Sequence, residues 1–492
     1  MKHETMTAVV CPRLPVPDSF SMEERLFRPQ PLVDAELRLR RLEAAIAADL
    51  EVLRYPSTPL PYMPRAGMLE VAIVGAGQTG KSIAFGLRRY GCHNVKVFDQ
   101  RPKGLQGPWR TYGRNHLLRT KKESTGGMEW GIPNLHFQRW ADARYGEDYF
   151  TGIRKIPRLV WADYLDWYGD ILRLPVDYDV KVESVDWNGA VRCFDLVTSN
   201  GPVRAQFVVL CSGIESAGLY RFPPQVTAAL PRTAYSHTME DLPGDRIVDR
   251  DIVMIGAGAS AFDTANAALE AGARSVDMMV RRPDLPQAHR SCWGSKWNGY
   301  HRHYIDLPDA LKWSYSLGDL DLGVPPPRDT YYEAIRDPRF TLYGSAAIDS
   351  LAFEHGKIVG SYGGRIFRHD YMICGTGSQN AVSDQDELAP LLPKIALWRD
   401  VFDPVGQDTH PELEGSPYLG PSLQFTPRDP GDSYLGRVYY LCSGVAHLSG
   451  FRCNLSGLQF AAPRVCHDIS RQLFLDHADE VKAAFDTYNL WE

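Results

Sequence analysis

Two glycine-rich turns, each set between a short apolar strand and a helix of small residues, constrain this chain most. The first turn lies in VAIVGAGQTG (71–80) and the second in IVMIGAGASAFD (252–263). Where a strand leads through such a turn into a helix, unpaired backbone N–H groups and the positive end of the helix dipole face a phosphate. Two of these units predict an α/β protein with two Rossmann-like dinucleotide-binding domains.

Each residue of the first unit has a physical task. Gly75 permits the tight turn, Gly77 lets the backbone approach a pyrophosphate, and Gly80 lets helix and strand pack closely. We expect a helix over 78–90, whose first residue Gln78 is a further candidate cofactor contact, and a second strand over 95–98. At the tip of that strand Asp99, 24 positions after Gly75 and followed by Gln100, can accept hydrogen bonds from ribose hydroxyls.

The second unit differs from the first at two places. It has Gly256 and Gly258, then Ser260, but Ala261 stands where the third glycine would be, and a side chain this small still permits close packing. Its next strand, expected over 275–280, ends in Arg281 and Arg282 instead of an acid. Arginine can grip a 2′-phosphate that an acid would repel, which favours NADPH over NADH. The alternative is a solvated surface pair.

The order of these units resembles that of the class B flavin monooxygenases, which include the flavin-containing, Baeyer–Villiger and N-hydroxylating enzymes. The resemblance extends from about Leu69 to Arg464. Four further segments are similar to family motifs: Gly107-Pro108-Trp109 after the first acid, IPRLVWADYLDW (156–167), VVLCSG (208–213), and DYMICGTG (370–377) with Gly375, Thr376 and Gly377, where Gly375 replaces the family's alanine.

The resemblance implies FAD at the first unit and NADPH at the second, with O₂ and a small molecule as the reactants. The nicotinamide domain would be inserted into a discontinuous FAD domain. We expect an N-terminal extension over 1–65 with one amphipathic helix, FAD-domain parts over 66–243 and 366–492, and the NADPH domain over 244–365. One oxygen atom would pass from a flavin C4a-hydroperoxide to the substrate, and N-hydroxylation of a small amine or amino acid is the favoured reaction.

Two family patterns are broken. Of the Baeyer–Villiger fingerprint, only His237 agrees, so lactone formation is disfavoured and His237 is expected to be a linker residue. The flavin-side asparagine of the flavin-containing branch is absent from 118–124. There Lys121 and Lys122 could contact an anionic substrate or a peroxide, or form a solvated pair. Two segments, 289–303 and 443–459, are weaker candidates for the pocket and the flavin ring.

The composition excludes several other classes. A net charge of −6 gives no nucleic-acid footprint, and the nine cysteines, without a CxxC pair, argue against a disulfide framework, a zinc site or a disulfide reductase. No metal site is expected. No apolar run could cross a bilayer, and we expect a cytoplasmic protein. Baeyer–Villiger or sulfur oxygenation and an NADPH-dependent quinone reductase remain alternatives. The substrate and the oligomeric state, including a homo-oligomer, are left open.

Overall fold

A parallel core with an antiparallel flank forms the first sheet of the molecule. The computed structural model describes residues 29–213, 218–286, 293–294, 296–442, 447–450 and 455–488. In the first sheet, β3, β2, β1, β6 and β17 run parallel, and β5 and β4 continue it antiparallel from β6. The strands are β1 (Leu69–Val74), β2 (Val95–Phe98), β3 (Val176–Asp177), β4 (Val182–Asn188), β5 (Cys193–Thr198), β6 (Gly201–Leu210) and β17 (Val438–Tyr440).

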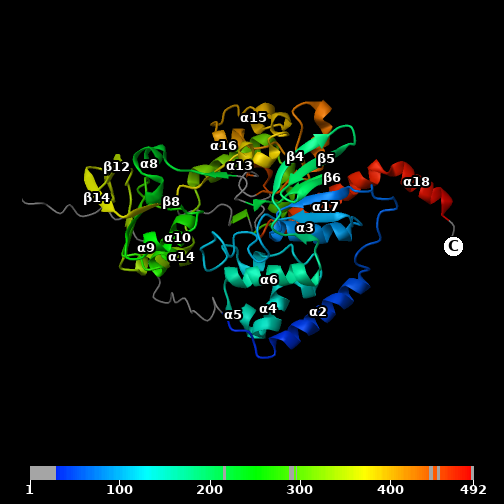
Figure 1. The fold of residues 1–492 in the computed structure, drawn as a ribbon, viewed down its shortest axis with the longest axis horizontal. Coiled ribbons are helices and arrows are strands. Elements are labelled where there is room, and N and C mark those ends of the chain that lie inside the picture. Colours follow the sequence, from blue (N-terminus) through cyan, green and yellow to red (C-terminus); the bar gives the residue numbers. More distant parts are fainter. Residues whose placement is uncertain are drawn as a thin grey trace, which may run out of the picture.

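Both faces of this sheet are covered, because its buried strand residues are apolar on both sides. Val71 and Ile73 pack with α3 and α17, whereas Ala72 and Val208 face a second core. The helix expected near the N-terminus is α2, which rests on α4 (Figure 1). The helices of this half are α2 (Ala35–Val52), α3 (Gln78–Arg89), α4 (Phe137–Tyr145), α5 (Glu147–Gly152), α6 (Arg158–Ile171), α17 (Leu458–Asp476) and α18 (Ala478–Thr487).

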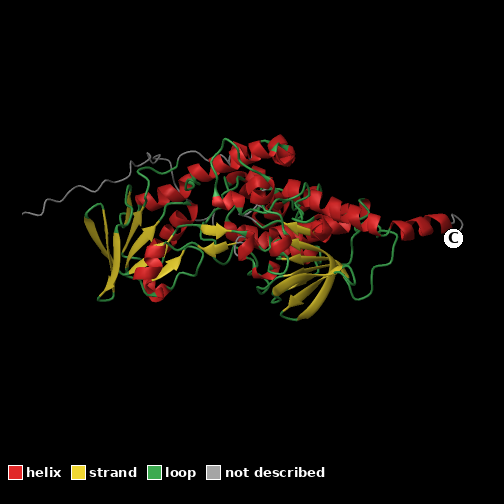
Figure 2. Cartoon of the chain, turned by 90° about the horizontal axis from the view of Figure 1, so that it is seen from above, coloured by secondary structure: helices red, strands yellow, loops and turns green. Residues whose placement is uncertain are grey.

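The second sheet is parallel throughout, in the order β11-β10-β9-β15-β8. Figure 2 shows it apart from the first sheet, with a smaller antiparallel sheet, β12-β13-β14, beyond it. The strands are β8 (Tyr235–His237), β9 (Asp251–Ile255), β10 (Ser275–Met279), β11 (Phe340–Tyr343), β12 (Ser350–Glu354), β13 (Lys357–Tyr362), β14 (Arg365–His369) and β15 (Tyr371–Cys374); the helices are α8 (Pro224–Ala229), α9 (Gly244–Ile247), α10 (Ala259–Glu270) and α14 (Arg328–Arg336).

Each of the two main sheets, with the helices packed on it, forms one lobe: the first lobe contains β1 and the second contains β9. Some elements belong to a different lobe from the one that their position in the sequence predicts. Strands β8 and β15 lie outside 244–365 and nevertheless belong to the second sheet. Helix α13 (Asp309–Leu322) lies inside that range, but its Trp313 packs with Trp398 of α15 (Trp398–Val401) and Leu413 of α16 (Pro411–Glu414). The remaining elements are α12 (Asn298–His303) and the pair β7 (Gly218–Tyr220) and β16 (Ser378–Asn380). Sequence periodicity locates strands but not the sheet that they join, because pairing depends on distant residues.

Candidate dinucleotide sites and the contact between the lobes

In the first glycine-rich turn, Gly75 and Gly80 are crowded by the protein, whereas Gly77 borders open space. Gly75 has φ +102°, and a Cβ there would lie 2.5 Å from the Cys211 carbonyl oxygen. A Cβ at Gly80 would lie 1.9 Å from the Gly75 carbonyl oxygen, whereas one at Gly77 would meet nothing within 4 Å. The turn is therefore closed toward the protein and open at the start of α3, where a pyrophosphate needs room.

Asp99 lies at the end of β2, as predicted, and holds the turn in place. Its Oδ2 accepts a hydrogen bond of 2.7 Å from the Ala76 N–H, and its Oδ1 accepts one of 2.9 Å from the Arg101 N–H. Burial raises the pKa of this carboxyl, and the two backbone hydrogen bonds oppose that shift. The adjoining Gln100 is exposed. A carboxylate placed beside the turn in this way fits an adenosine ribose.

A charged network that the sequence did not reveal holds the loop with Gly107 and Trp109. Arg110 donates 2.6 Å bonds to both Asp163 and Asp166 of α6. The Lys81 side chain, in α3, is 1% exposed, and its ammonium donates to the Leu165 carbonyl at 2.9 Å and lies 3.6 Å from Asp166. Burial lowers its pKa to about 8, although the carboxylates oppose this.

A lysine directly after the third glycine, on the buried face of a helix, was the available signal for this network. So was the three-residue spacing of Asp163 and Asp166, which places both on one face of α6. The network joins α3, α6 and the loop over 104–110, and so fixes the loop relative to the first glycine-rich turn. Arg158 adds a hydrogen bond to the Trp109 carbonyl.

The second turn has the geometry of the first, except that Ala261 occupies the third glycine position and packs against Gly375. Gly256 has φ +93°, a Cβ at Gly258 would meet nothing within 4 Å, and Ser260 is exposed at the start of α10. Ala261 is buried, and a Cβ at Gly375 would lie 2.6 Å from its methyl group. The glycine at 375 thus leaves the space that the methyl group of Ala261 fills, which accounts both for the alanine at the third glycine position and for the glycine in place of the family's alanine.

The crossing from β15 back to the first lobe is held by polar contacts. The Thr376 hydroxyl donates to the Arg221 carbonyl, and the Gly377 carbonyl lies 3.0 Å from His237 Nε2. His237 is fully buried at the end of β8 and stacks on Tyr220, with ring centroids 5.1 Å apart. It is therefore a packed strand residue, and its expected role as a linker residue is wrong.

The two arginines beyond β10 have different surroundings. Arg282 donates 2.9 Å hydrogen bonds to the carbonyls of Asp321 and Leu322, at the end of α13. Arg281 is exposed, and no hydrogen bond or ion pair joins it to the part of the chain that the structure describes. Arg281 is thus the better placed of the two for a 2′-phosphate, whereas Arg282 closes the end of a helix.

The two candidate lysines also differ. The Lys122 ammonium donates to the carbonyls of Phe150 and Thr151 and lies 4.8 Å from the centre of the Phe150 ring. Lys121 is exposed and its ammonium has no partner among the described residues. Since Lys122 is engaged at the end of α5, the Lys121 ammonium is the more accessible of the two.

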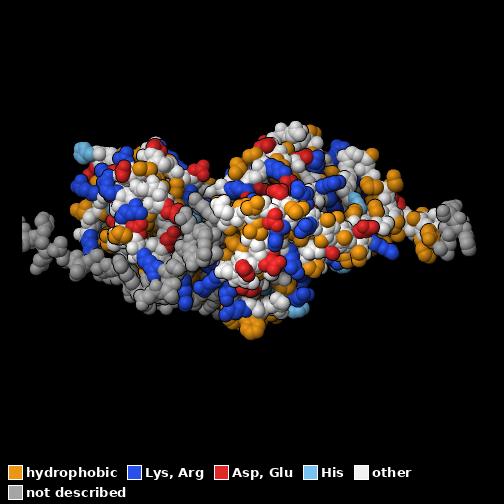
Figure 3. Space-filling view, turned by 90° about the horizontal axis from the view of Figure 1, so that it is seen from below, with side chains coloured by type: hydrophobic (Ala, Val, Ile, Leu, Met, Phe, Trp, Pro, Cys, Tyr) orange, Lys and Arg blue, Asp and Glu red, His pale blue; other side chains and the backbone are white. Residues whose placement is uncertain are grey.

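Basic side chains of the first lobe contact the second lobe where the two meet. Arg114, from the first lobe, donates to the carbonyls of Thr238 and Glu240. Lys155 forms a 3.0 Å ion pair with Asp329 of α14. The face in Figure 3 carries basic and acidic side chains interspersed over both lobes. Polar contact of this kind is typical of domains that can move relative to each other.

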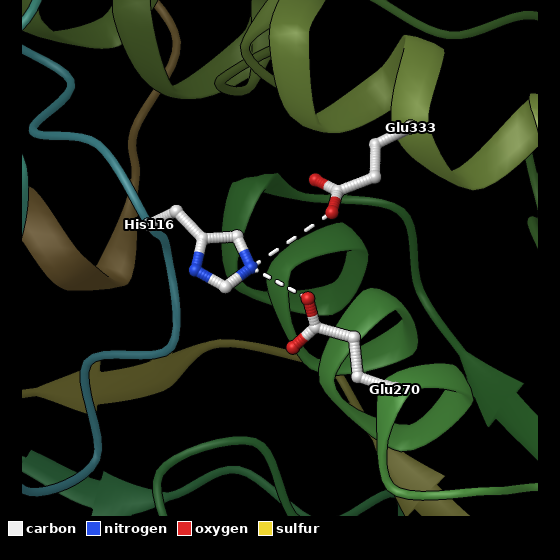
Figure 4. A group of neighbouring side chains, drawn as sticks. All are labelled: His116, Glu270 and Glu333. Atoms are coloured by element: carbon white, nitrogen blue, oxygen red, sulfur yellow. Dashed lines mark hydrogen bonds and ion pairs between the residues drawn. The ribbon is translucent and has the colours of Figure 1, made fainter. Parts of the chain in front are cut away.

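Figure 4 shows another of these contacts, in which His116 lies between two carboxylates of the second lobe. Its Nε2 is 2.8 Å from Glu270 Oε1 and 3.8 Å from Glu333 Oε1. The hydrogen bond to Glu270 raises the pKa of His116, while burial opposes it. Burial raises the pKa of Glu333 to about 7. The imidazole thus joins the two lobes through its hydrogen bond to Glu270.

We expect Glu270→Gln to destabilise the protein in acid but not in alkaline solution. A histidine with a raised pKa contributes stability below its ordinary pKa and loses it as the pH rises through the raised value. The melting temperatures of wild type and variant should therefore converge with increasing pH. Because His116→Gln removes the same contact, the double variant should lose no more than either single variant. A difference that is constant from pH 5 to about 9 would contradict this account.

Parts of the two weaker candidate segments lie outside the described residues. These are 289–292 and 295 within the aromatic segment, and 443–446 and 451–454 within the segment expected near the flavin ring. Of the latter, Gly457 is described and precedes α17. A Cβ at Gly127 would lie 2.5 Å from the Gln459 nitrogen, so residues that follow the two lysines pack against the start of that helix.

Comparisons with known proteins agree with this arrangement. Residues 72–298 match the family model described as "Pyridine nucleotide-disulphide oxidoreductase". The chain is 33% identical over 459 residues to the FAD-dependent urate hydroxylase of Xanthomonas campestris, covering 92% of this chain and 97% of the relative. Its structure is similar to the ornithine N-hydroxylase of Kutzneria sp. 744, with a TM-score of 0.65 and 16% identity over 82% of this chain and 100% of the other.

The fold and the paired glycine-rich turns define a class B flavin-dependent monooxygenase, as the sequence predicted. Within that class, the chain belongs to the family that contains the urate hydroxylase. The FAD-containing monooxygenase EthA of Mycobacterium tuberculosis is a more distant relative, 28% identical over 44% of this chain and 42% of its own length. Over the described residues, no helix has the length and apolarity to cross a membrane.

Proposed function

We propose that this enzyme uses FAD, NADPH and O₂ to hydroxylate a small, nitrogen-rich anion, with urate or a related oxopurine as the first candidate. The observation that carries the proposal is the likeness to a urate hydroxylase over nearly the whole of both chains. When bound, FAD reduced by NADPH supplies the electrons and the oxygen-transfer chemistry. One oxygen atom enters the substrate, and the other leaves as water while NADPH becomes NADP⁺.

The residues of this chain would hold the two cofactors at the turns already described. Gly77 and Gly258 leave room for the two pyrophosphates, Asp99 would accept from the FAD ribose, and Arg281 would bind the 2′-phosphate of NADPH. The turns fit these groups because open space lies at the start of each helix, where the amides are unpaired. We also propose Gln100, Trp109 and Thr376 as residues that contact the cofactors.

The segment from Arg119 to Gly127 supports a substrate site between the lobes. Arg119 contacts α10 of the second lobe, and Gly127 packs against the start of α17 in the first. Lys121 lies between them, exposed. Because urate is an anion at neutral pH, an ammonium there would attract it and offset its charge. N-hydroxylation of an amino acid is the second candidate, favoured by the motif over 156–167 and by the same lysine, which suits a carboxylate.

The test is product analysis with labelled oxygen. The FAD-loaded enzyme receives NADPH and ¹⁸O₂ with urate, ornithine, lysine or a quinone in separate reactions. We expect urate to accelerate NADPH oxidation and to yield a product that carries one ¹⁸O atom. Labelled hydroxylamine from ornithine or lysine would select the second candidate instead. Fast NADPH oxidation with a quinone, without label in any product, would make the protein a reductase.

A further inference from the structure

An arginine of the first lobe reaches the second glycine-rich turn. Arg119 donates a 2.7 Å hydrogen bond from Nη2 to Asp263 Oδ2, and the same nitrogen lies 3.5 Å from the Ser260 hydroxyl. Ser260 and Asp263 both belong to the first turns of α10, whereas Arg119 is 144 residues away from Asp263 in the sequence. This ion pair joins the lobes at the dinucleotide turn itself, unlike the contacts of Arg114 and Lys155.

The burial of Asp263 explains why the guanidinium is held there. The Asp263 side chain is 3% exposed, and its burial raises its pKa, while the charge of Arg119 opposes that shift. A buried carboxylate is costly without a hydrogen-bonded cation, so the pair fixes the position of the arginine. The Arg119 side chain is 44% exposed. Because a guanidinium has five N–H donors, it keeps donors for a further anion.

The groups beside Arg119 are those that receive a phosphate. The N-terminus of α10 has no side-chain cap at Gly258, and a Cβ on that glycine would meet nothing within 4 Å. Unpaired amides, the exposed Ser260 hydroxyl and the guanidinium thus border one open space. An anion in that space would be held by hydrogen bonds from both lobes, since Arg119 alone among these groups comes from the first lobe.

We infer that Arg119 binds the pyrophosphate of the nicotinamide cofactor across the boundary between the lobes, and that Asp263 is the positioning residue that aims it. The inference rests on the proposed use of NADPH. The ion pair then does more than join the lobes, because it holds Arg119 where the first lobe can bind a cofactor that the second lobe also binds. Arg281 would then bind the 2′-phosphate of the cofactor, and Arg119 would bind its pyrophosphate.

Calorimetric titration of the oxidised, FAD-loaded enzyme separates these roles without turnover. The ligands are NADP⁺, NAD⁺, which lacks the 2′-phosphate, and 2′-AMP, which lacks the pyrophosphate. Loss of a charge-assisted hydrogen bond should make Arg119→Ala bind NADP⁺ and NAD⁺ about 10- to 100-fold more weakly, with 2′-AMP unchanged. Asp263→Asn should weaken both dinucleotides, but less, because the arginine remains.

Arg114→Ala is the matched control, since it removes an arginine from the same segment that contacts the second lobe but not α10. It should leave all three affinities near those of wild type and the FAD content unchanged, while the loss of two hydrogen bonds lowers the melting temperature. The inference is overturned if Arg119→Ala binds both dinucleotides within twofold of wild type, if it weakens 2′-AMP equally, or if Arg114→Ala reproduces its effect. Because no substrate is present, a protein that oxygenates nothing can still pass this test, and the two failures are distinguishable.

Discussion

Gly80→Ala should yield a protein that neither retains FAD nor melts as a native flavoprotein. The added methyl group would lie 1.9 Å from the Gly75 carbonyl oxygen, which belongs to the backbone and cannot rotate away. Overpacking of about 1–3 kcal/mol or more should lower the melting temperature by roughly 1–2 °C per kcal/mol in a chain of this size. The measurements are FAD content after purification and thermal unfolding followed by circular dichroism.

Gly77→Ala is the matched variant in the same turn. Its φ of −66° suits alanine, and its methyl group would meet nothing within 4 Å of the protein. It should fold with a melting temperature near that of wild type when both are free of FAD, yet bind FAD more weakly, because the methyl group occupies the space left for the pyrophosphate. If both variants behaved alike, the distinction between a packing glycine and a ligand-facing glycine would be lost.

The second large effect concerns the choice between NADPH and NADH. Arg281→Ala should lower kcat/KM for NADPH about 10- to 100-fold through the loss of a charge-assisted hydrogen bond to phosphate. The value for NADH should hardly change. Flavin reduction by each cofactor, measured in a stopped flow without oxygen, gives the ratio directly.

Arg282→Ala supplies the comparison for that prediction. Because Arg282 donates to the carbonyls at the end of α13, its loss should lower stability and leave the preference for NADPH unchanged. Equal losses with both cofactors in Arg281→Ala, or a larger change in preference in Arg282→Ala, would refute the assignment of the 2′-phosphate to Arg281.

The two turns could be predicted from sequence because they depend on local rules. Gly75, Gly77 and Gly80 follow a buried strand at fixed spacing, and Asp99 ends the next strand, so neighbouring residues alone define the unit. The helix α2 was likewise readable from its apolar spacing. The second unit followed the same logic, including the tolerance for Ala261.

The contacts that join distant residues could not be predicted in this way. The pair of Arg119 and Asp263 depends on how one lobe is turned against the other, which no local pattern encodes. The burial of Lys81 depends on a carboxylate in α6 that lies far along the chain. Lys121 and Lys122 looked equivalent in the sequence, and only the carbonyls at the end of α5 distinguish them.

The close packing of Ala261 against Gly375 has a consequence for how this family's sequences are compared. The total side-chain volume at the two sites is what the packing of α10 on β15 restricts, so each residue is acceptable only given the other. Substitutions here should be non-additive: Gly375→Ala alone overfills the site, whereas the same change together with Ala261→Gly restores its volume. A sequence comparison that scores each position separately counts two independent differences at 261 and 375, although the two residues form one coupled pair.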